Sequence, residues 1–195
     1  NLKSLYVLLK NENIDVVVNN AGFGVYGSFT STDLSQELNM IDVNVMSVHV
    51  LTKLFLKDMK KRDSGYILNV SSSASFYPGP LMASYYASKA YVRSLTEAIS
   101  YELEKEHSHV KVCCLCPGPV DTNFNKRAGV EFSVSPLSSK DVAKYAVDGM
   151  FRGKRVIVPG FTMRCAKFFS RFASVHFIMK IVYRIQDKKK AKSNS

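Results

Sequence analysis

Short runs of apolar residues alternate along the chain with longer stretches in which apolar positions recur at helical spacing. The short runs predict β-strands at residues 14–19, 66–71, 110–116 and 155–159. The first run, IDVVVN, is continuous and β-branched, which is typical of a strand buried on both faces of a sheet. The longer stretches predict helices over residues 2–10, 33–62, 84–106 and 139–151. The stretch over 33–62 is long enough for two helices.

This alternation of strand and helix predicts a doubly wound α/β fold, with a mostly parallel sheet covered by helices on both faces. Ligands bind such sheets at the carboxyl ends of the strands. Small and polar residues follow three of the predicted strands at this edge, in the segments Asn20–Gly22, Ser71–Ser73 and Pro117–Pro119. The sequence therefore places a candidate site there.

The last 35 residues differ in pattern from the preceding 160. Residues 161–185 predict one basic amphipathic helix, and the Lys-rich tail after it holds Lys188, Lys189, Lys190 and Lys192. Two interpretations are compatible: the helix packs over a substrate pocket, or it contacts the surface of an anionic membrane. We therefore divide the chain into an α/β domain over 1–160, which holds the candidate site, and a C-terminal segment over 161–195.

The net charge of +11 is concentrated in this C-terminal segment. Residues 161–195 contain nine Lys or Arg and one Asp, a net charge of +8, which leaves +3 for the rest of the chain. Nucleic-acid-binding proteins more often spread a basic face over the fold, so we expect no nucleic-acid partner.

Composition narrows the class of protein further. Apolar residues make up 46% of the chain and charged residues 22%, which excludes a disordered protein. Three of the four cysteines lie in the run 110–116 without CxxC spacing. We expect them to be buried, reduced strand residues in a cytoplasmic protein, and we expect no metal site.

A YxxxK pattern occurs three times, at Tyr6/Lys10, Tyr85/Lys89 and Tyr101/Lys105. Only Tyr85 opens a predicted helix just after a strand and a loop that contains Gly and Pro. Ser72 lies 13 residues before Tyr85, at the end of that strand. The context therefore selects Tyr85/Lys89 as the functional pair.

The chemistry of this pair suits proton transfer. Residues i and i+4 share one face of a helix, and a nearby ammonium group lowers the pKa of a tyrosine hydroxyl, which is otherwise near 10. A serine hydroxyl can donate a hydrogen bond to a substrate carbonyl oxygen. Together, Ser72, Tyr85 and Lys89 suit the protonation of an alkoxide, while the hydride requires a cofactor.

Five ordered motifs resemble the short-chain dehydrogenase/reductase family, whose domain is Rossmann-like. They are NNAG at 19–22, IDVNV at 41–45, NVSSSAS at 69–75, YYASK at 85–89 and PGPVDT at 117–122. Their order and separations match the family over nearly all of residues 1–160. The segment SFYPGPLMASYYASKA is also similar to bacterial reductases related to eukaryotic 3-ketoacyl and steroid reductases.

The resemblance implies an oxidoreductase that interconverts a carbonyl and an alcohol with NAD or NADP. The catalytic residues that it implies are Asn44, Ser72, Tyr85 and Lys89. The cofactor-binding residues that it implies are Asn20, Ala21, Gly22, Tyr85, Lys89, Pro117, Gly118, Val120 and Thr122. Phe76, Tyr77 and Pro119 are expected to face the substrate.

One part of the family pattern does not occur in this sequence. The family begins with a strand, a TGxxxGxG turn that holds the cofactor pyrophosphate, a helix and two more strands, whereas residues 14–19 match the fourth strand of the family. Roughly 60–80 family residues precede that strand. We therefore expect an exposed apolar edge at Val16, Val17 and Val18, and weak NAD(P) binding. The chain is either a fragment of a normal enzyme, or a short protein that is inactive or completed by another chain.

Two functions remain open at this stage. The first is the oxidoreductase, acting on an apolar or lipid-like small molecule and paired as a homodimer or homotetramer through the helices that hold Asn44 and Tyr85, as the resemblance implies. The second is a non-catalytic remnant or a membrane-surface binding module, which would add a peripheral membrane location to the cytoplasmic one.

Overall fold

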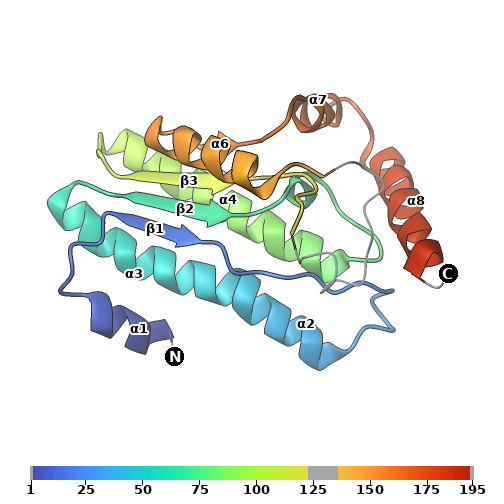
Figure 1. The fold of residues 1–195 in the computed structure, drawn as a ribbon, viewed down its shortest axis with the longest axis horizontal. Coiled ribbons are helices and arrows are strands. Elements are labelled where there is room, and N and C mark those ends of the chain that lie inside the picture. The colour runs from blue at the N-terminus through green and yellow to red at the C-terminus, as the bar shows by residue number, and fades with distance from the viewer. Residues whose placement is uncertain (1, 123–135, 194–195) are drawn as a thin grey trace.

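A four-stranded parallel sheet forms the middle layer of the protein, as a computed structural model shows (Figure 1). The structure describes residues 2–122 and 136–193, and side chains as far as residue 187. The strands lie side by side in chain order, as β1 (Val16–Asn19), β2 (Tyr66–Val70), β3 (Lys111–Leu115) and β4 (Val156–Ile157). The predicted parallel α/β fold is confirmed.

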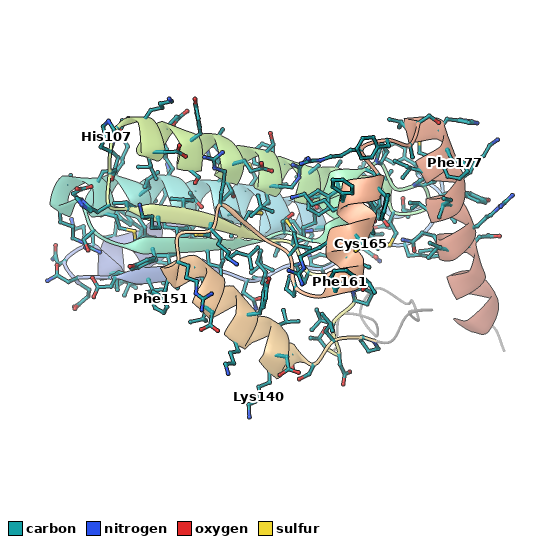
Figure 2. The ribbon with its side chains drawn as sticks, turned by 90° about the horizontal axis from the view of Figure 1, so that it is seen from above. His107, Lys140, Phe151, Phe161, Cys165 and Phe177 are labelled. Atoms are coloured by element: carbon teal, nitrogen blue, oxygen red, sulfur yellow. The ribbon has the colours of Figure 1, made fainter. Side chains whose placement is uncertain are left out.

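Helices cover both faces of this sheet. Helices α3 (Ser47–Arg62) and α4 (Ala83–Lys105) pack on one face, where α3 contacts β1 and β2 and α4 contacts β2 and β3. Helix α6 (Ser139–Phe151) packs on β2, β3 and β4 from the other face, as Figure 2 shows between its labels Lys140 and Phe151. The short helix α1 (Leu2–Leu9) packs against α3.

Alternate strand residues supply the two halves of the core, because successive side chains of a strand point to opposite faces. The half under α3 and α4 buries Phe55, Met59, Ile67, Leu103, Val110 and Val112. The half under α6 buries Leu68, Cys113, Leu115, Val142, Ala146, Met150 and Ile157. The central strands are thus buried on both faces, as a parallel sheet requires.

Strand β1 differs from the central strands. It is an edge of the described sheet and pairs with β2 alone among the described strands. Val17 packs into the core under α3, but Val16 and Val18 are 40% and 52% exposed. The prediction of an exposed apolar edge is therefore confirmed for Val16 and Val18 and wrong for Val17. The prediction that this strand is buried on both faces is wrong, because α6 packs on β2, β3 and β4.

The predicted pair of helices over 33–62 is confirmed, with a π-helical turn between them. Helix α2 (Leu34–Ile41) begins at Asp33, whose carboxylate accepts a hydrogen bond from the Gln36 amide at 2.9 Å. The π-helical turn η1 (Asp42–Met46) follows directly, and α3 continues from it. Such single π turns inside helices occur often at functional sites.

The C-terminal segment forms two helices instead of the single predicted one. Helix α7 (Phe161–Phe169) ends before Ser170, and α8 (Val175–Ser193) begins after a short break. The Lys-rich stretch belongs to the α8 backbone, so the prediction of a tail beyond the helix is also wrong. Along the parts of the chain that the structure describes, no helix has both the length and the apolar character to cross a bilayer.

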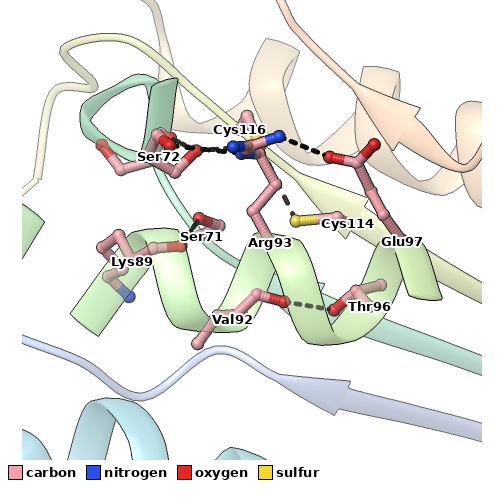
Figure 3. A network of polar contacts seen from close by, with 10 residues as sticks. Ser71, Ser72, Lys89, Val92, Arg93, Thr96, Glu97, Cys114 and Cys116 are labelled. Atoms are coloured by element: carbon pink, nitrogen blue, oxygen red, sulfur yellow. Dashed lines mark hydrogen bonds and ion pairs between the residues drawn. The ribbon is translucent and has the colours of Figure 1, made fainter. Parts of the chain in front are cut away.

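A buried polar network ties the middle of the sheet to α3 and α4. The Asn69 side chain, on β2, accepts hydrogen bonds from Asn19 Nδ2 at 2.8 Å and from Thr52 Oγ1 at 3.1 Å. Its Nδ2 donates to Thr96 Oγ1 at 3.0 Å, and the Thr96 hydroxyl donates to the Val92 carbonyl at 2.6 Å (Figure 3). One amide therefore joins β1, β2 and two helices at fixed positions.

We expect Asn69→Leu to lower the free energy of unfolding by about 2–4 kcal/mol, because it removes the acceptor of Asn19 and Thr52 and the donor to Thr96 from a buried place. Urea denaturation measures this loss. Asn39→Leu on the exposed surface of α2 is the matched control, with an expected change below about 0.5 kcal/mol. Equal effects of the two substitutions would contradict the role given to the network.

Candidate active site

A cavity of about 660 Å³ opens at the carboxyl ends of β2 and β3. It is bounded by the segments that follow the strands, by the first turns of α4, and by residues of α7 and α8. Of the predicted site residues, the cavity wall contains Asn20, Gly22, Ser72, Tyr85, Lys89, Pro117, Gly118, Val120 and Thr122. Ala21 and Asn44 are not on the wall. Tyr77 and Pro119, two of the three predicted substrate-facing residues, are.

Tyr85 lies in the first turn of α4 and is buried. Its hydroxyl forms a hydrogen bond with Ser72, and its ring meets that of Tyr86 edge to face at 6.1 Å between centroids. Burial raises the pKa of Tyr85 to about 12, a rise that the bond to Ser72 only partly offsets. At neutral pH Tyr85 is therefore a neutral phenol that can donate a proton.

Lys89 lies one helical turn after Tyr85 and is buried although its side chain carries an amine. Its Nζ donates a hydrogen bond to the Val70 carbonyl at the end of β2, at 3.0 Å. Burial lowers the pKa of Lys89 to about 8, and the nearby thiols of Cys114 and Cys116 act in the opposite direction. Lys89 is not among the groups that shift the pKa of Tyr85, which burial raises and the bond to Ser72 lowers. The lowering of that pKa by Lys89 stays a prediction.

Ser72 holds its place through the turn that follows β2. Its Oγ accepts a hydrogen bond from the Ala74 amide at 3.1 Å and so caps the short 3₁₀ helix η2 (Ser73–Phe76). The neighbouring Ser71 hydroxyl donates to the Lys89 carbonyl at 2.7 Å, which fastens α4 to the end of β2 (Figure 3). The Ser72 hydroxyl thereby faces Tyr85 from a fixed turn.

Asn44 is fully buried in the π-helical turn and acts as a clamp on the loop after β1. Its Oδ1 accepts from the Phe23 amide at 3.1 Å, and its Nδ2 donates to the Phe23 carbonyl at 2.9 Å and to Ser88 Oγ at 3.1 Å. The side chain thus joins this loop to α4. Its structural role here is positioning, and the described contacts do not place it against substrate.

Gly22 is required by the crowding beneath this loop. A Cβ atom at residue 22 would lie 2.9 Å from Asn44 Oδ1 and 3.0 Å from Lys89 Nζ. Any side chain there would displace one of the two. The loop backbone therefore lies directly beside the buried lysine.

Phe76 lies away from the cavity, so the prediction that it faces the substrate is wrong. It packs beside Cys114 and Cys116, and its ring lies 5.1 Å from the Arg93 guanidinium and 4.7 Å from the Lys167 ammonium. Cys114 and Cys116 are buried, with their sulfur atoms 3.7 Å apart (Figure 3). Across the described ranges, no group of three or more His, Cys, Asp or Glu side chains could hold a metal ion.

The structure adds wall residues that sequence reasoning missed. They are chiefly apolar and aromatic, and they include Phe23, Met82, Tyr86, Met163, Val182, Ile185 and Gln186. The position of Tyr86 on the wall could have been predicted, because Tyr86 directly follows Tyr85 in the YYASK motif. Val182 and Gln186 form a pair four residues apart on the inward face of α8. That face could be identified only once α8 was known to lie against the cavity.

The fold and this Ser–Tyr–Lys arrangement define a Rossmann-like α/β protein with a site at the carboxyl ends of its strands. The short chain dehydrogenase family matches the sequence over residues 6–131. The chain belongs to that family, as the motif analysis predicted. The finer similarity to 3-ketoacyl and steroid reductases stays a prediction.

The curated proteins that this chain resembles in sequence support its assignment to the family. "Dehydrogenase/reductase SDR family member 11" of Gallus gallus is 31% identical over 150 residues, which cover 70% of this chain and 59% of the relative. An uncharacterized oxidoreductase of Staphylococcus epidermidis is 33% identical over 153 residues, which cover 77% of this chain and 64% of the relative. The chain thus spans about three fifths of the length of these curated relatives.

Solved structures share the fold at low sequence identity. A 7β-hydroxysteroid dehydrogenase superposes with a TM-score of 0.80 at 18% identity, over 93% of this chain and 71% of that one. A short-chain dehydrogenase from Sphingobium yanoikuyae in complex with NADPH has a TM-score of 0.76 at 22% identity, over 87% of this chain and 68% of that one. The Rossmann-like fold class is confirmed.

The burial of Lys89 predicts a specific pH dependence of stability. Its pKa in the folded state, about 8, is below the ordinary 10.5, so the unfolded chain binds more protons between these values and stability rises with pH across that window. Below pH 8 the buried charge costs roughly 3 kcal/mol. We expect the free energy of unfolding of Lys89→Met, relative to that of wild type, to be highest near pH 7 and to fall as the pH rises to about 10.5.

Urea denaturation of wild type and Lys89→Met at a series of pH values measures this difference. The loss of the bond to the Val70 carbonyl lowers the stability of the variant by about the same amount at every pH. The test is therefore how the stability difference between variant and wild type changes with pH, and not its size at one pH. Lys53→Met, at an exposed position of α3, controls for the loss of a positive side chain. A difference that does not vary with pH would refute the assignment.

Proposed function

We propose that this protein is an NAD(P)-dependent oxidoreductase that interconverts a carbonyl and an alcohol on an apolar or lipid-like substrate. The observation that carries the proposal is the meeting of three groups in one cavity. The Tyr85 hydroxyl is bonded to Ser72, and Lys89 lies one helical turn further along the same wall. A family relative in complex with NADPH and another in complex with NAD support the cofactor.

The residues present fit the nicotinamide half of such a cofactor. Gly22 keeps the loop after β1 free of a side chain beside Lys89, and the wall after β3 offers Pro117, Gly118, Val120 and Thr122. Asn20 and Gly22 would border the cofactor from the side of β1. When bound, NAD(P) supplies or accepts the hydride.

The protein's own groups account for the proton side of the reaction. The Ser72 hydroxyl donates a hydrogen bond to the substrate oxygen and orients it toward Tyr85. In the reduction, Tyr85 donates its phenolic proton to the oxygen as negative charge develops there, and the neutral form of Tyr85 at pH 7 suits this role. Lys89 positions the first turns of α4 and presents a cationic group beside the site.

The cavity wall supports an apolar substrate. Many of its residues are aromatic or aliphatic, among them Phe23, Tyr77, Met82, Tyr86, Val182 and Ile185. Apolar walls with a few convergent polar groups are typical of sites for small organic ligands. Polar groups concentrate near Tyr85, where the reacting carbonyl would lie.

We expect Tyr85→Phe to reduce carbonyl reduction by about 10²–10⁴-fold, because it removes the acid while keeping the ring. The loss of NAD(P)H absorbance with a panel of apolar ketones measures turnover. Tyr101→Phe is a matched control, since Tyr101 is an exposed residue of α4 that also precedes a lysine by four positions. The comparison is made in a chain that also carries the N-terminal segment of the family, and unchanged turnover in Tyr85→Phe would refute the mechanism.

The exposed surface of α7 and α8 favours a second function, contact with an anionic membrane. Large aromatic side chains lie exposed there, among them Phe161 on α7 and Phe177 on α8, both labelled in Figure 2. The exposed phenylalanines are Phe161, Phe168, Phe169, Phe172 and Phe177. Basic side chains lie between them in sequence, at Arg164, Arg171, Lys180 and Arg184. Aromatic groups beside cationic ones suit the interface of an anionic bilayer.

We expect the protein to co-sediment with phosphatidylcholine vesicles that contain phosphatidylserine, and less with phosphatidylcholine alone or at high salt. Replacing both Phe169 and Phe172 with Ser is expected to weaken this binding by about tenfold or more, because buried aromatic area is lost. Phe29→Ser, at an equally exposed phenylalanine elsewhere, is the control. Equal binding to both lipids would exclude the membrane function.

A further inference from the structure

One buried polar atom of a residue on the cavity wall, Gln186 Oε1, has neither a partner in the described part of the fold nor a role in the proposed proton transfer. Gln186, on the inward face of α8, is 3% exposed and lines the cavity. Its Nε2 donates a hydrogen bond to the Tyr86 hydroxyl at 2.9 Å. Its Oε1 has no hydrogen-bond partner within the described part of the chain, and no other buried side-chain oxygen or nitrogen there is in that position.

An unpaired amide oxygen is costly in a buried place, because it has lost water without gaining a donor. The neighbouring inward residue, Val182, is apolar, and an apolar residue at 186 would leave no unpaired oxygen, although it would also remove the donor to Tyr86. The bond to Tyr86 therefore explains the amide nitrogen of Gln186 but not its oxygen. The bond from Tyr26 to the main-chain carbonyl of Gln186, at 3.0 Å, fixes α8 without using the side chain.

Tyr86 completes the arrangement. Its hydroxyl accepts from Gln186 and lines the same cavity, and Gln186 is its one hydrogen-bond partner among the described contacts. A phenol that accepts one hydrogen bond still has its own hydrogen to donate. Gln186 and Tyr86 together thus offer one acceptor and one donor, which is the complement of a hydroxyl group.

We infer that Gln186 and Tyr86 form a second polar subsite that recognises a hydroxyl group on the substrate, at a distance from the reacting carbonyl. The inference rests on the proposed function and narrows its substrate class to hydroxylated apolar ketones, or the corresponding diols. The ligand hydroxyl donates to Gln186 Oε1 and accepts from Tyr86, while the apolar body lies against Val182 and Ile185. Gln186 is a specificity residue, and Tyr85 remains the proton donor.

Direct binding to the chain tests this subsite without any need for turnover. The probes are tetralone, its hydroxy isomers and the matching methoxytetralones, measured by isothermal titration calorimetry. The methoxy compounds match the hydroxy compounds in position but cannot donate a hydrogen bond. We expect at least one hydroxytetralone to bind about tenfold or more tightly than both tetralone and its methoxy counterpart, since it satisfies a buried acceptor.

Three variants distinguish the effect of the Gln186 side-chain amide from that of the position of α8. In Gln186→Leu the hydroxyl preference is expected to fall to within about twofold, and Tyr86→Phe, which keeps the ring, is expected to reduce it too. Tyr26→Phe removes the bond to the Gln186 main chain but keeps the amide, and it is expected to retain the preference.

Two results would overturn the inference: the absence of any hydroxyl preference in the wild type, or a preference that persists in both Gln186→Leu and Tyr86→Phe. Because the readout is binding, it is separate from the turnover lost or kept in Tyr85→Phe. A hydroxyl preference in a chain that turns over no ketone would support the subsite and reject the proposed catalysis.

Discussion

The burial of the Lys89 amine is the constraint on which the rest of the site depends. A cationic group held in the interior has a lowered pKa, and the structure meets the cost with one directed contact, from Nζ to the Val70 carbonyl. That contact requires the end of β2 and the second turn of α4 to stay together. Ser71, which donates to the Lys89 main chain, maintains the same junction from the strand side.

The remaining parts of the site follow from this junction. Because Tyr85 precedes Lys89 by one helical turn, fixing the lysine also sets the tyrosine beneath the turn that carries Ser72. The loop after β1 must then pass close to the lysine, which only a glycine at 22 permits, and Asn44 holds that loop against α4. The buried lysine thus fixes the position of α4, and the position of α4 fixes the arrangement of Ser72 and Tyr85 in the candidate site.

The sequence predicted those features that local chemistry determines. The β-branched runs gave the strands, and the motif around Tyr85 gave the residues that meet in the cavity. Features that depend on the neighbours of an element were not predictable. Val16 and Val18 have the composition of a fully buried strand, yet they are exposed because α6 covers β2, β3 and β4. The break between α7 and α8 carries no Gly or Pro signal, so the basic pattern predicted one helix. Gln186 lies just beyond the helix predicted over 161–185, and its place on the cavity wall could be identified only once α8 was seen to face the cavity.

The raised pKa of Tyr85 shows that a lysine close in sequence is not enough to predict a lowered tyrosine pKa, because burial acts on the same group. A lysine four residues away was expected to favour the phenolate, but the same burial that brings the two side chains together also penalises the charged form of each. The pKa of Tyr85 rises to about 12 and that of Lys89 falls to about 8, so desolvation governs both groups. Between these pKa values both side chains are neutral, and Tyr85 keeps the proton that the proposed carbonyl reduction would consume. For the proposed reaction, the desolvation of both side chains therefore favours Tyr85 as the proton donor.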